Sequence, residues 1–251
     1  MDYKKIYGLV YGQNVVYEVL KGGKREIKKI YLAGNIKSDI KEKIAKIVRH
    51  KNILAEITTR EILDKITRGG LHQGVAAEVS EISVYSIEEA INFANESKES
   101  PFFLILNNIN DPQNTGALLR VAEACKVHGM IISSHNNPTI NSTVVKTSAG
   151  ASEYVPIIME NNIAQTIDKL KKSGVWIFGA HMDGDTDYYN ADFNLPLALV
   201  VGNEGEGLQH LVRAKCDFLL KIPMLGKINS LNVSVAGALL MFEILRKRNK
   251  I

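Results

Sequence analysis

The sequence has only two cysteines, Cys125 and Cys216, in 251 residues. Neither has the spacing of a metal ligand, so we expect two reduced, buried thiols rather than a disulfide or a zinc site. No stretch approaches the ~18 consecutive apolar residues of a membrane span. The first residues, MDYKKIYGLVYGQ, lack the apolar run and the cleavage site of a secretory signal. These absences favour a cytoplasmic protein without metal.

The composition, 45% apolar and 23% charged, is that of an ordinary globular protein with room for one large or two modest domains. The net charge of +4 hides an asymmetry. The first 80 residues carry 16 Lys and Arg against 9 Asp and Glu, whereas the other 171 carry 15 against 18. A basic front end favours contact with a polyanion such as nucleic acid, although a solvated lysine-rich surface would look the same.

Residues 1–80 are predicted to form a small α/β domain, because short apolar runs alternate with amphipathic ones. The expected helices cover 12–20, a segment capped by Ser38, and 59–66, where Thr58 and Glu61 fit a capping box. The expected strands cover 28–33, 53–57 and 74–79. This alternation predicts at least partly parallel pairing.

Residues 81–101 are interpreted as a linker, because a helical piece at 87–94 runs into the polar stretch NESKES before Pro101. Residues 102–251 are predicted to form a second α/β domain. Its strands of about five or six apolar residues separated by helices are typical of a parallel sheet covered on both faces. In such sheets, ligands bind outside the carboxyl ends of the strands.

Three strands of this second domain are followed by loops rich in polar and glycine residues. These loops are NNINDPQNTGALLR at 107–120, GNEGEG at 202–207, and GKINSLN at 226–232, which precedes an apolar helix from Val233. Asn114 is a candidate cap for the helix after the first loop, and Arg120 lies farther along that helix, where it needs solvent or an anion. The start of the helix at Val233 offers unpaired N–H groups to a polar ligand, although a simple Ser/Asn cap is an equal alternative.

Together the three loops resemble the SpoU-type, TrmH-like RNA ribose 2′-O-methyltransferases of the SPOUT superfamily. The matching motifs are NxxDPxNxGAxxR at 108–120, VVGNEGEGL at 200–208 and IPMxGxxxSLNVSVAxA at 222–238. The front end, with YGQNVVYEVL, KKIYLA and LHQGVAAEV, resembles the substrate-binding domain of RlmB-like 23S rRNA guanosine-2′-O-methyltransferases. The resemblance therefore covers nearly the whole chain.

The resemblance implies a fold that periodicity does not predict. The C-terminal SPOUT domain would have a mostly parallel sheet and a deep trefoil knot, preceded by a small α/β RNA-binding domain. S-adenosylmethionine would bind in the knot, largely through backbone groups. The implied cofactor-binding residues are Gly202, Ile222 and Leu231, with Asn203, Met224, Ser230 and Asn232 as supporting candidates.

The implied reaction is transfer of the sulfonium methyl group to a ribose 2′-hydroxyl, with Arg120 at the reacting centre. A guanidinium stays protonated, so we expect Arg120 to bind the target phosphate and stabilise alkoxide charge rather than act as a base. Glu204 would assist with the proton. The other catalytic candidates are Asn114, Ser230 and Asn232.

The resemblance also implies a homodimer that binds ribosomal RNA. Candidate RNA contacts in the first domain are Lys24, Arg25, Lys28 and Lys29, and His72 is expected to make a structural hydrogen bond. Three alternatives stay open: methylation of transfer RNA, a non-catalytic RNA-binding member of the same fold, and an α/β enzyme using a nicotinamide or nucleotide cofactor.

Overall fold

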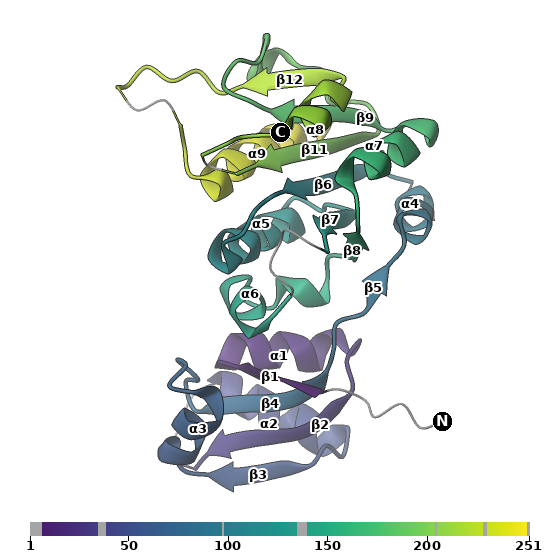
Figure 1. Ribbon diagram of the computed structural model, residues 1–251. Helices are drawn as coiled ribbons and strands as arrows, with labels where there is room; N and C mark the ends of the chain where they lie inside the picture. The colour runs from purple at the N-terminus through teal and green to yellow at the C-terminus, as the bar shows by residue number, and fades with distance from the viewer. Residues whose placement is uncertain are drawn as a thin grey trace. The chain divides into compact units, whose positions relative to one another are not determined.

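The computed structural model describes residues 7–34, 39–96, 98–134, 140–203, 205–227 and 230–249. The chain divides into two units, each with its own sheet (Figure 1). Unit 1 comprises Met1–Ser83 and Ile140–Tyr154, and unit 2 comprises Val84–Thr139 and Val155–Ile251. No helix in the described part of the chain is long and apolar enough to cross a membrane.

Unit 1 is built on a sheet with strand order β1-β4-β2-β3. Its strands are β1 (Tyr7–Tyr11), β2 (Ile27–Ala33), β3 (Ala55–Thr58) and β4 (Val75–Ser80), and its helices are α1 (Gln13–Gly22), α2 (Asp39–His50), α3 (Arg60–Thr67) and α6 (Ser142–Thr147), with the short 3₁₀ helix η1 (Ala151–Glu153). β2 and β3 pair in parallel, whereas β4 pairs antiparallel with both β1 and β2. The expected partly parallel pairing is confirmed.

Two local expectations in unit 1 need correction. The cap of α3 is Thr59, whose side chain accepts a hydrogen bond from the N–H of Ile62, and not Thr58. Thr58 is instead the last residue of β3, and its side-chain oxygen is buried without a partner among the described residues. The first strand, β1, had no counterpart in the predicted elements.

The segment 140–154 follows β7 in the sequence yet belongs to the core of unit 1. Val145 of α6 packs in the same hydrophobic cluster as Val15 and Val19 of α1. Glu153 forms an ion pair with Arg25 at 3.3 Å, and the two side chains are only 1% and 7% exposed. Burial raises the pKa of Glu153 and lowers the pKa of Arg25, while each partner opposes the other's shift. A buried pair of this kind holds its two segments together, because either charge alone would be costly there.

Unit 2 is built on a sheet with strand order β10-β12-β9-β11-β6-β7-β8-β5, in which the described pairs are parallel. Its strands are β5 (Val84–Tyr85), β6 (Phe102–Asn107), β7 (Gly129–Ser133), β8 (Ile157–Glu160), β9 (Trp176–Ala180), β10 (Thr186–Asp187), β11 (Leu197–Gly202) and β12 (Phe218–Lys221). Its helices are α4 (Ile87–Glu96), α5 (Pro112–Ala124), α7 (Ile163–Lys172), α8 (His210–Lys215) and α9 (Val233–Asn249), with the 3₁₀ helix η2 (Tyr188–Asn190).

Helices cover both faces of this sheet, as the apolar strands predicted. Ile87 of α4, Ile167 of α7 and Val212 of α8 share one core cluster with Phe103 and Ile105 of β6. On the other face α5 lies beside α9 (Figure 1), where a side chain at Gly237 would run into Leu118. On this face, the starts of α5 and α9 lie near the carboxyl ends of β6 and β12.

The end of α9 is fixed by Arg248. Its guanidinium donates to the carbonyl oxygens of Ser100, Pro101, Phe193 and Leu195 and lies over the ring of Phe102. Burial lowers the pKa of Arg248 to about 10. These bonds tie the last helix to the beginnings of β6 and β11, so α9 has one defined position against the sheet.

The segment 81–101, interpreted above as a linker, is structured and its greater part lies in unit 2. β5 pairs with β8, and α4 buries Ile87, Ala90 and Ala94. The boundary between the units falls after Ser83. Polar residues after a helix resemble a linker in sequence, but here the apolar face of α4 contributes to the core.

Both cysteines are free thiols, as expected; Cys125 is buried and Cys216 is half-buried. Burial raises the pKa of Cys125 to about 11 and that of Cys216 to about 12, so both stay protonated at neutral pH. In the described part of the chain, no group of three or more His, Cys, Asp and Glu side chains could hold a metal ion.

Candidate active site

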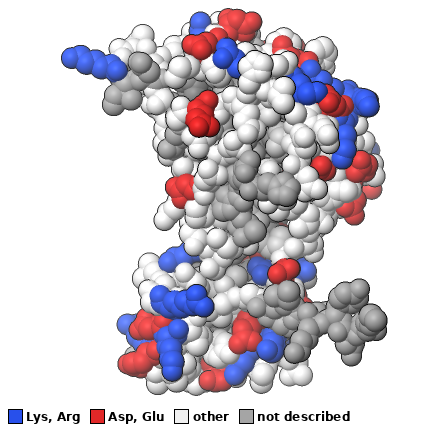
Figure 2. Space-filling model, in the orientation of Figure 1, with Lys and Arg blue, Asp and Glu red and all other residues white. Residues whose placement is uncertain are grey.

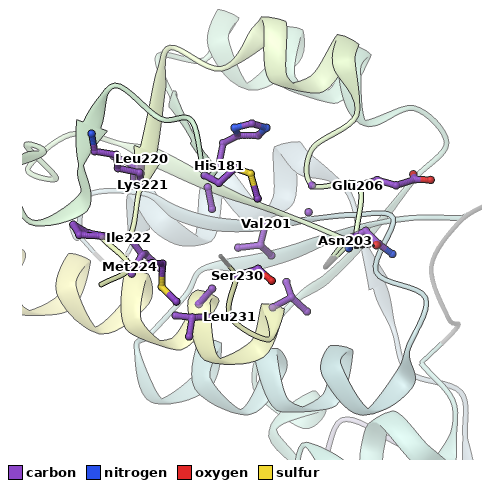
Figure 3. Close-up of a pocket in the computed structure, with 18 residues that line it drawn as sticks. His181, Val201, Asn203, Glu206, Leu220, Lys221, Ile222, Met224, Ser230 and Leu231 are labelled. Atoms are coloured by element: carbon purple, nitrogen blue, oxygen red, sulfur yellow. Dashed lines mark hydrogen bonds between the residues drawn. The ribbon is translucent and has the colours of Figure 1, made fainter. Parts of the chain in front are cut away.

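A cavity of about 480 Å³ lies at the carboxyl ends of β9, β11 and β12 (Figure 3). Because these strands are parallel and adjacent, the loops that follow them meet at one edge of the sheet. The lining residues are Ala180, His181, Met182, Val201, Gly202, Asn203, Gly205, Glu206, Gly207, Leu220, Lys221, Ile222, Pro223, Met224, Ser230, Leu231, Val233 and Ala236. The cavity is within the range of about 300–1,000 Å³ typical of small-molecule sites.

The loop after β11 is folded into a tight turn that forms one wall of the cavity. The backbones of Asn203 and Gly207 exchange hydrogen bonds of 3.1 and 2.8 Å, and the Asn203 side chain accepts another from Gly205 N–H. A Cβ at Gly202 would collide with the Gly207 carbonyl, so only glycine allows the turn to fold back this closely. The glycines of the second motif therefore set the shape of the cavity.

The loop after β6 is attached to this turn. The Asn203 side-chain amide donates to the carbonyl oxygen of Asn108 at 3.2 Å. The side chain of Asn107, 1% exposed, donates to Gln209 Oε1 and accepts from Gln209 N–H at 2.9 and 2.8 Å. Neither Asn107 nor Gln209 was singled out in the sequence, although both flank predicted motifs.

The loop before α9 is attached to the start of α5 by two asparagines. Asn232 donates from Nδ2 to Asn114 Oδ1 at 3.0 Å. Its own Oδ1 accepts from Ser234 N–H and Oγ–H at the beginning of α9. The cap of α5 is Asp111, which accepts from Gln113 N–H, so the expected capping role of Asn114 is wrong. Asn114 instead joins the first loop to the third.

Six of the seven residues predicted to contact the cofactor line the cavity, and Asn232 does not. In Figure 3 the side chains of Val201, Ser230 and Leu231 are drawn near the centre of the site, with Ile222 and Met224 to their left. Apolar side chains and strand-end backbone groups dominate this surface. Such a site suits a flat aromatic ring with a polar extension, which is the chemistry of a nucleoside-containing ligand.

The structure does not bring every catalytic candidate to the cavity. Arg120 is an exposed residue of α5 and does not line it. It lies six residues beyond Asn114, ~9 Å along the helix axis. Glu204 is outside the described residues, and Ser230 lies in the cavity wall.

His181 is a lining residue that the sequence reading missed. Its Nδ1 accepts from Asp183 N–H at 3.1 Å, so the neutral ring carries its proton on Nε2. Burial lowers the pKa of His181, the charge of Arg213 lowers it further, and Asp183 partly opposes both. Its position directly after β9 was the signal, because polar residues at the carboxyl end of a parallel strand face the ligand edge.

The four predicted RNA contacts of unit 1 differ in their surroundings. Lys24 is exposed, whereas the Arg25 side chain is buried against Glu153 and is not available to RNA. Lys28 pairs with Glu78 at 3.3 Å, and Lys29 pairs with Glu56 at 2.5 Å. His72 is structural, as expected: its Nδ1 accepts from Gly74 N–H, and its Nε2 lies 3.0 Å from Asp64.

Comparison with known proteins agrees with this architecture. The family described as SpoU rRNA Methylase matches residues 101–242, and the domain described as RNA 2′-O ribose methyltransferase substrate binding matches residues 9–85. The chain therefore belongs to the SpoU/TrmH family of RNA methyltransferases. It is 39% identical to YacO of Bacillus subtilis, described as a TrmH family tRNA/rRNA methyltransferase, over 96% of each chain. A Staphylococcus aureus protein of the same description is 38% identical over 97% of each chain.

Solved structures show the same fold. AviRb, a SpoU methyltransferase of Streptomyces viridochromogenes solved with AdoMet, aligns with a TM-score of 0.81 at 21% identity over 97% of this chain and 91% of its own. An AdoMet-bound rRNA methyltransferase of Sinorhizobium meliloti aligns with a TM-score of 0.79 at 23% identity, over 96% and 87%. A TrmH/SpoU tRNA-modifying enzyme of A. aeolicus covers only 65% of this chain and 84% of its own, with a TM-score of 0.55 and 25% identity.

Proposed function

We propose that this protein uses S-adenosylmethionine to methylate a ribose 2′-hydroxyl, that of a guanosine, in 23S ribosomal RNA. The observation that carries the proposal is the cavity formed where the loops after β11 and β12 meet, in a chain of the SpoU/TrmH family. The solved relatives that hold AdoMet share this fold. The relatives of matching length are described as tRNA/rRNA methyltransferases.

The residues present fit the proposed cofactor. Ile222, Leu231 and Val201 provide an apolar surface for an adenine ring, and Gly202 leaves its backbone open to close approach. Asn203, Met224 and Ser230 complete the set that would hold the cofactor. The bound cofactor supplies the electrophilic methyl group of its sulfonium.

Arg120 would bind the phosphate beside the target ribose. Its permanent positive charge would then offset the negative charge that develops on the 2′-oxygen as the proton leaves. Glu204 is proposed to assist with that proton. The bond between Asn114 and Asn232 would hold the Arg120 helix in register with the cofactor loop, and Ser230 would help to orient the ribose.

We also propose that the protein works as a homodimer through α9. Val235, Leu239 and Phe242 follow one another at helical spacing and are 53%, 37% and 51% exposed. Three apolar side chains on one helix face, beside the active-site edge, suit a second copy of this chain. A monomer in light scattering at micromolar concentration would contradict this assembly.

Ribosomal RNA is favoured over transfer RNA by the presence of unit 1. Structures of tRNA-modifying relatives cover only 65% and 61% of this chain, whereas the rRNA methyltransferase of S. meliloti covers 96%. We further propose that the segment before α9 threads through the loop after β11 as a trefoil knot. The two free thiols and an RNA substrate suit the cytoplasm as the place of action.

The decisive experiment maps 2′-O-methyl groups in total RNA from cells with and without this chain. In cells without the chain, we expect one guanosine of 23S rRNA to lose its 2′-O-methyl group. If a tRNA nucleotide loses its methyl group instead, tRNA is the substrate. An unchanged map in both RNA classes would contradict the activity.

The Arg120→Ala variant tests the mechanism. Its kcat should fall by about 100-fold or more, because one preorganised charge at a developing anion contributes roughly 3 kcal/mol. The AdoMet Kd from calorimetry should stay within about threefold of the wild type, since Arg120 does not line the cavity. Turnover near the wild-type rate would refute the role of Arg120.

A further inference from the structure

Unit 1 contains a second cavity, of about 460 Å³, between the start of α1, the start of α3 and the loop before β4. Its lining residues are Gln13, Arg60, Asp64, Gly69, Gly70, Leu71, His72, Gln73 and Gly74. Most of these carry polar side chains or expose backbone. The cavity therefore differs in chemistry from the apolar active-site cavity of unit 2.

The loop 69–74 is held in one defined shape. The His72 ring bridges Asp64 of α3 and the N–H of Gly74. Gly69, Gln73 and Gly74 have φ values of 75°, 52° and 79°, in the left-handed region. A Cβ at Gly70 would approach the Tyr11 ring to 2.6 Å, so the loop lies directly against β1. A rigid loop presents its polar groups without a large ordering cost on binding.

Two glutamines that line the cavity are hydrogen-bonded to each other. Gln13 N–H donates to Gln73 Oε1 at 3.1 Å, and Gln13 Nε2 donates to the Gln73 carbonyl at 2.9 Å. These bonds leave Gln73 Nε2 without a partner among the described residues, and the side chain is exposed. Gln73 therefore presents two amide N–H donors at the opening.

Arg60 and Leu71 flank the opening with a charge and an apolar surface. Arg60 is exposed and makes no hydrogen bond or ion pair with the described residues. The pKa of neighbouring Glu61 is lowered mainly by its hydrogen bond with Thr59, and the charge of Arg60 lowers it slightly further. Leu71 is 67% exposed. The Asp64 carboxylate already faces His72. Figure 2 shows Lys and Arg mixed with Asp and Glu over the part of unit 1 that carries α3.

We propose that this cavity binds one unstacked nucleotide of a single-stranded RNA segment. Arg60 binds its phosphate, Gln73 Nε2 donates to an acceptor on the base edge, and Leu71 packs on the base face. Amide donors, guanidinium charge and exposed apolar side chains recognise splayed-out nucleotides in this way. The inference rests on the proposed function, since it makes this cavity the place where unit 1 binds the RNA substrate.

The cavity accounts for RNA binding better than the lysines of β2. Lys28 and Lys29 already face carboxylates, and Arg25 is buried. Arg60 and Gln73 offer a cation and a donor not used within the described structure, beside a preformed hollow.

The test measures binding of the full-length protein to transcribed 23S rRNA and to total tRNA by filter binding. Arg60→Ala should weaken 23S rRNA binding by about tenfold and reduce the salt slope by about 1, the effect of one lost phosphate contact. Gln73→Glu keeps an oxygen that accepts from Gln13 N–H, but it replaces the unpaired Nε2 amide with a second carboxylate oxygen. This variant should weaken 23S rRNA binding by a similar factor.

Two control variants match these changes away from the cavity. Arg49→Ala removes an exposed arginine from α2 whose Nε donates to the helix carbonyl of Ala45, and Gln165→Glu adds the same negative charge on α7. Both should stay within about twofold of the wild type. Thermal melting of each variant checks that unit 1 is folded.

The outcomes separate this inference from the proposed function. Equal weakening by Arg60→Ala and Arg49→Ala, or no weakening by Arg60→Ala and Gln73→Glu, would overturn the nucleotide site even if the enzyme methylates RNA normally. The wild type could instead bind RNA, lose that binding in Arg60→Ala and Gln73→Glu, and methylate neither RNA class. That result would support the nucleotide site and refute the proposed function. In an active enzyme, Arg60→Ala should raise KM and leave kcat and the AdoMet Kd unchanged.

Discussion

The two cavities have nearly the same volume, about 480 Å³ in unit 2 and 460 Å³ in unit 1, and opposite construction. The unit 2 cavity is assembled from the ends of three strands and the three loops that follow them, far apart in sequence, and its surface is mostly apolar side chains and backbone, with a few polar side chains such as His181 and Asn203. The unit 1 cavity is formed largely by one short loop and is lined by amides, an imidazole, a guanidinium and the Asp64 carboxylate. The unit 2 cavity is defined by its shape, which suits a cofactor of fixed structure. The unit 1 cavity is defined by its side-chain chemistry, which suits one nucleotide of an RNA chain.

The largest expected effect tests whether unit 1 depends on its buried ion pair. Glu153→Gln removes the ion-pair partner of Arg25, which is 7% exposed, and leaves it only the weaker attraction of Glu81, which should cost about 3–5 kcal/mol. Chemical denaturation should show unit 1 unfolding earlier, while AdoMet binding by unit 2 persists. Glu56→Gln is the control, because its partner Lys29 lies at the surface, where such ion pairs contribute little to stability. Equal stability losses in both variants would contradict the structural role of Glu153.

A smaller effect tests whether shape defines the unit 2 cavity. Gly202→Ala places a methyl group against the Gly207 carbonyl, and overpacking of this kind costs about 1–3 kcal/mol. The AdoMet affinity measured by calorimetry should fall by about 10- to 100-fold. Gly205→Ala in the same turn also adds a methyl group at the cavity, but its nearest protein atom lies at 3.5 Å, so it should lose much less AdoMet affinity than Gly202→Ala. Similar losses in both variants would mean that the turn is sensitive to any substitution.

The smallest effect concerns pH and unit 2. Burial lowers the pKa of His128, whose Nδ1 accepts from Phe102 N–H, and Glu99 partly opposes this shift. The unfolded state therefore binds more protons near pH 6, so this contribution to stability is complete above about pH 6.5 and is lost as pH falls through the folded-state pKa. His128→Gln should lose less stability than the wild type between pH 7 and pH 5 in thermal melts. A steeper loss in the variant would reverse the assigned sign.

The elements that could be predicted from the sequence are those in which apolar residues recur with a clear helix or strand period. They include the strands of both sheets, except β1 and the edge strands β5 and β10. Strand β1, YGLVY, is preceded by lysines and contains glycine, so its pattern resembles a loop until β4 pairs with it. The place of 140–154 in unit 1 depends on Val145 and Glu153 meeting residues more than 100 positions away. Local propensity carries no signal for such contacts.

For the sites, the predictable part was the convergence of loops at the carboxyl ends of parallel strands. Gly202, Ile222 and Leu231, which the resemblance to the SpoU/TrmH motifs implied as cofactor-binding residues, line the cavity. His181 and the cavity around Arg60 were missed. The position of His181 directly after a predicted strand was a signal for it, whereas the cavity around Arg60 becomes recognisable only when the tertiary structure shows which polar groups are already paired.

The most direct test measures two affinities on two variants. Gly202→Ala should lose AdoMet affinity and retain 23S rRNA affinity, whereas Arg60→Ala should retain AdoMet affinity and lose rRNA affinity. Calorimetry and filter binding on the same preparations give both values. A Gly202→Ala protein that binds AdoMet as tightly as the wild type would contradict the central claim that the loops after β11 and β12 form the methyl-donor site.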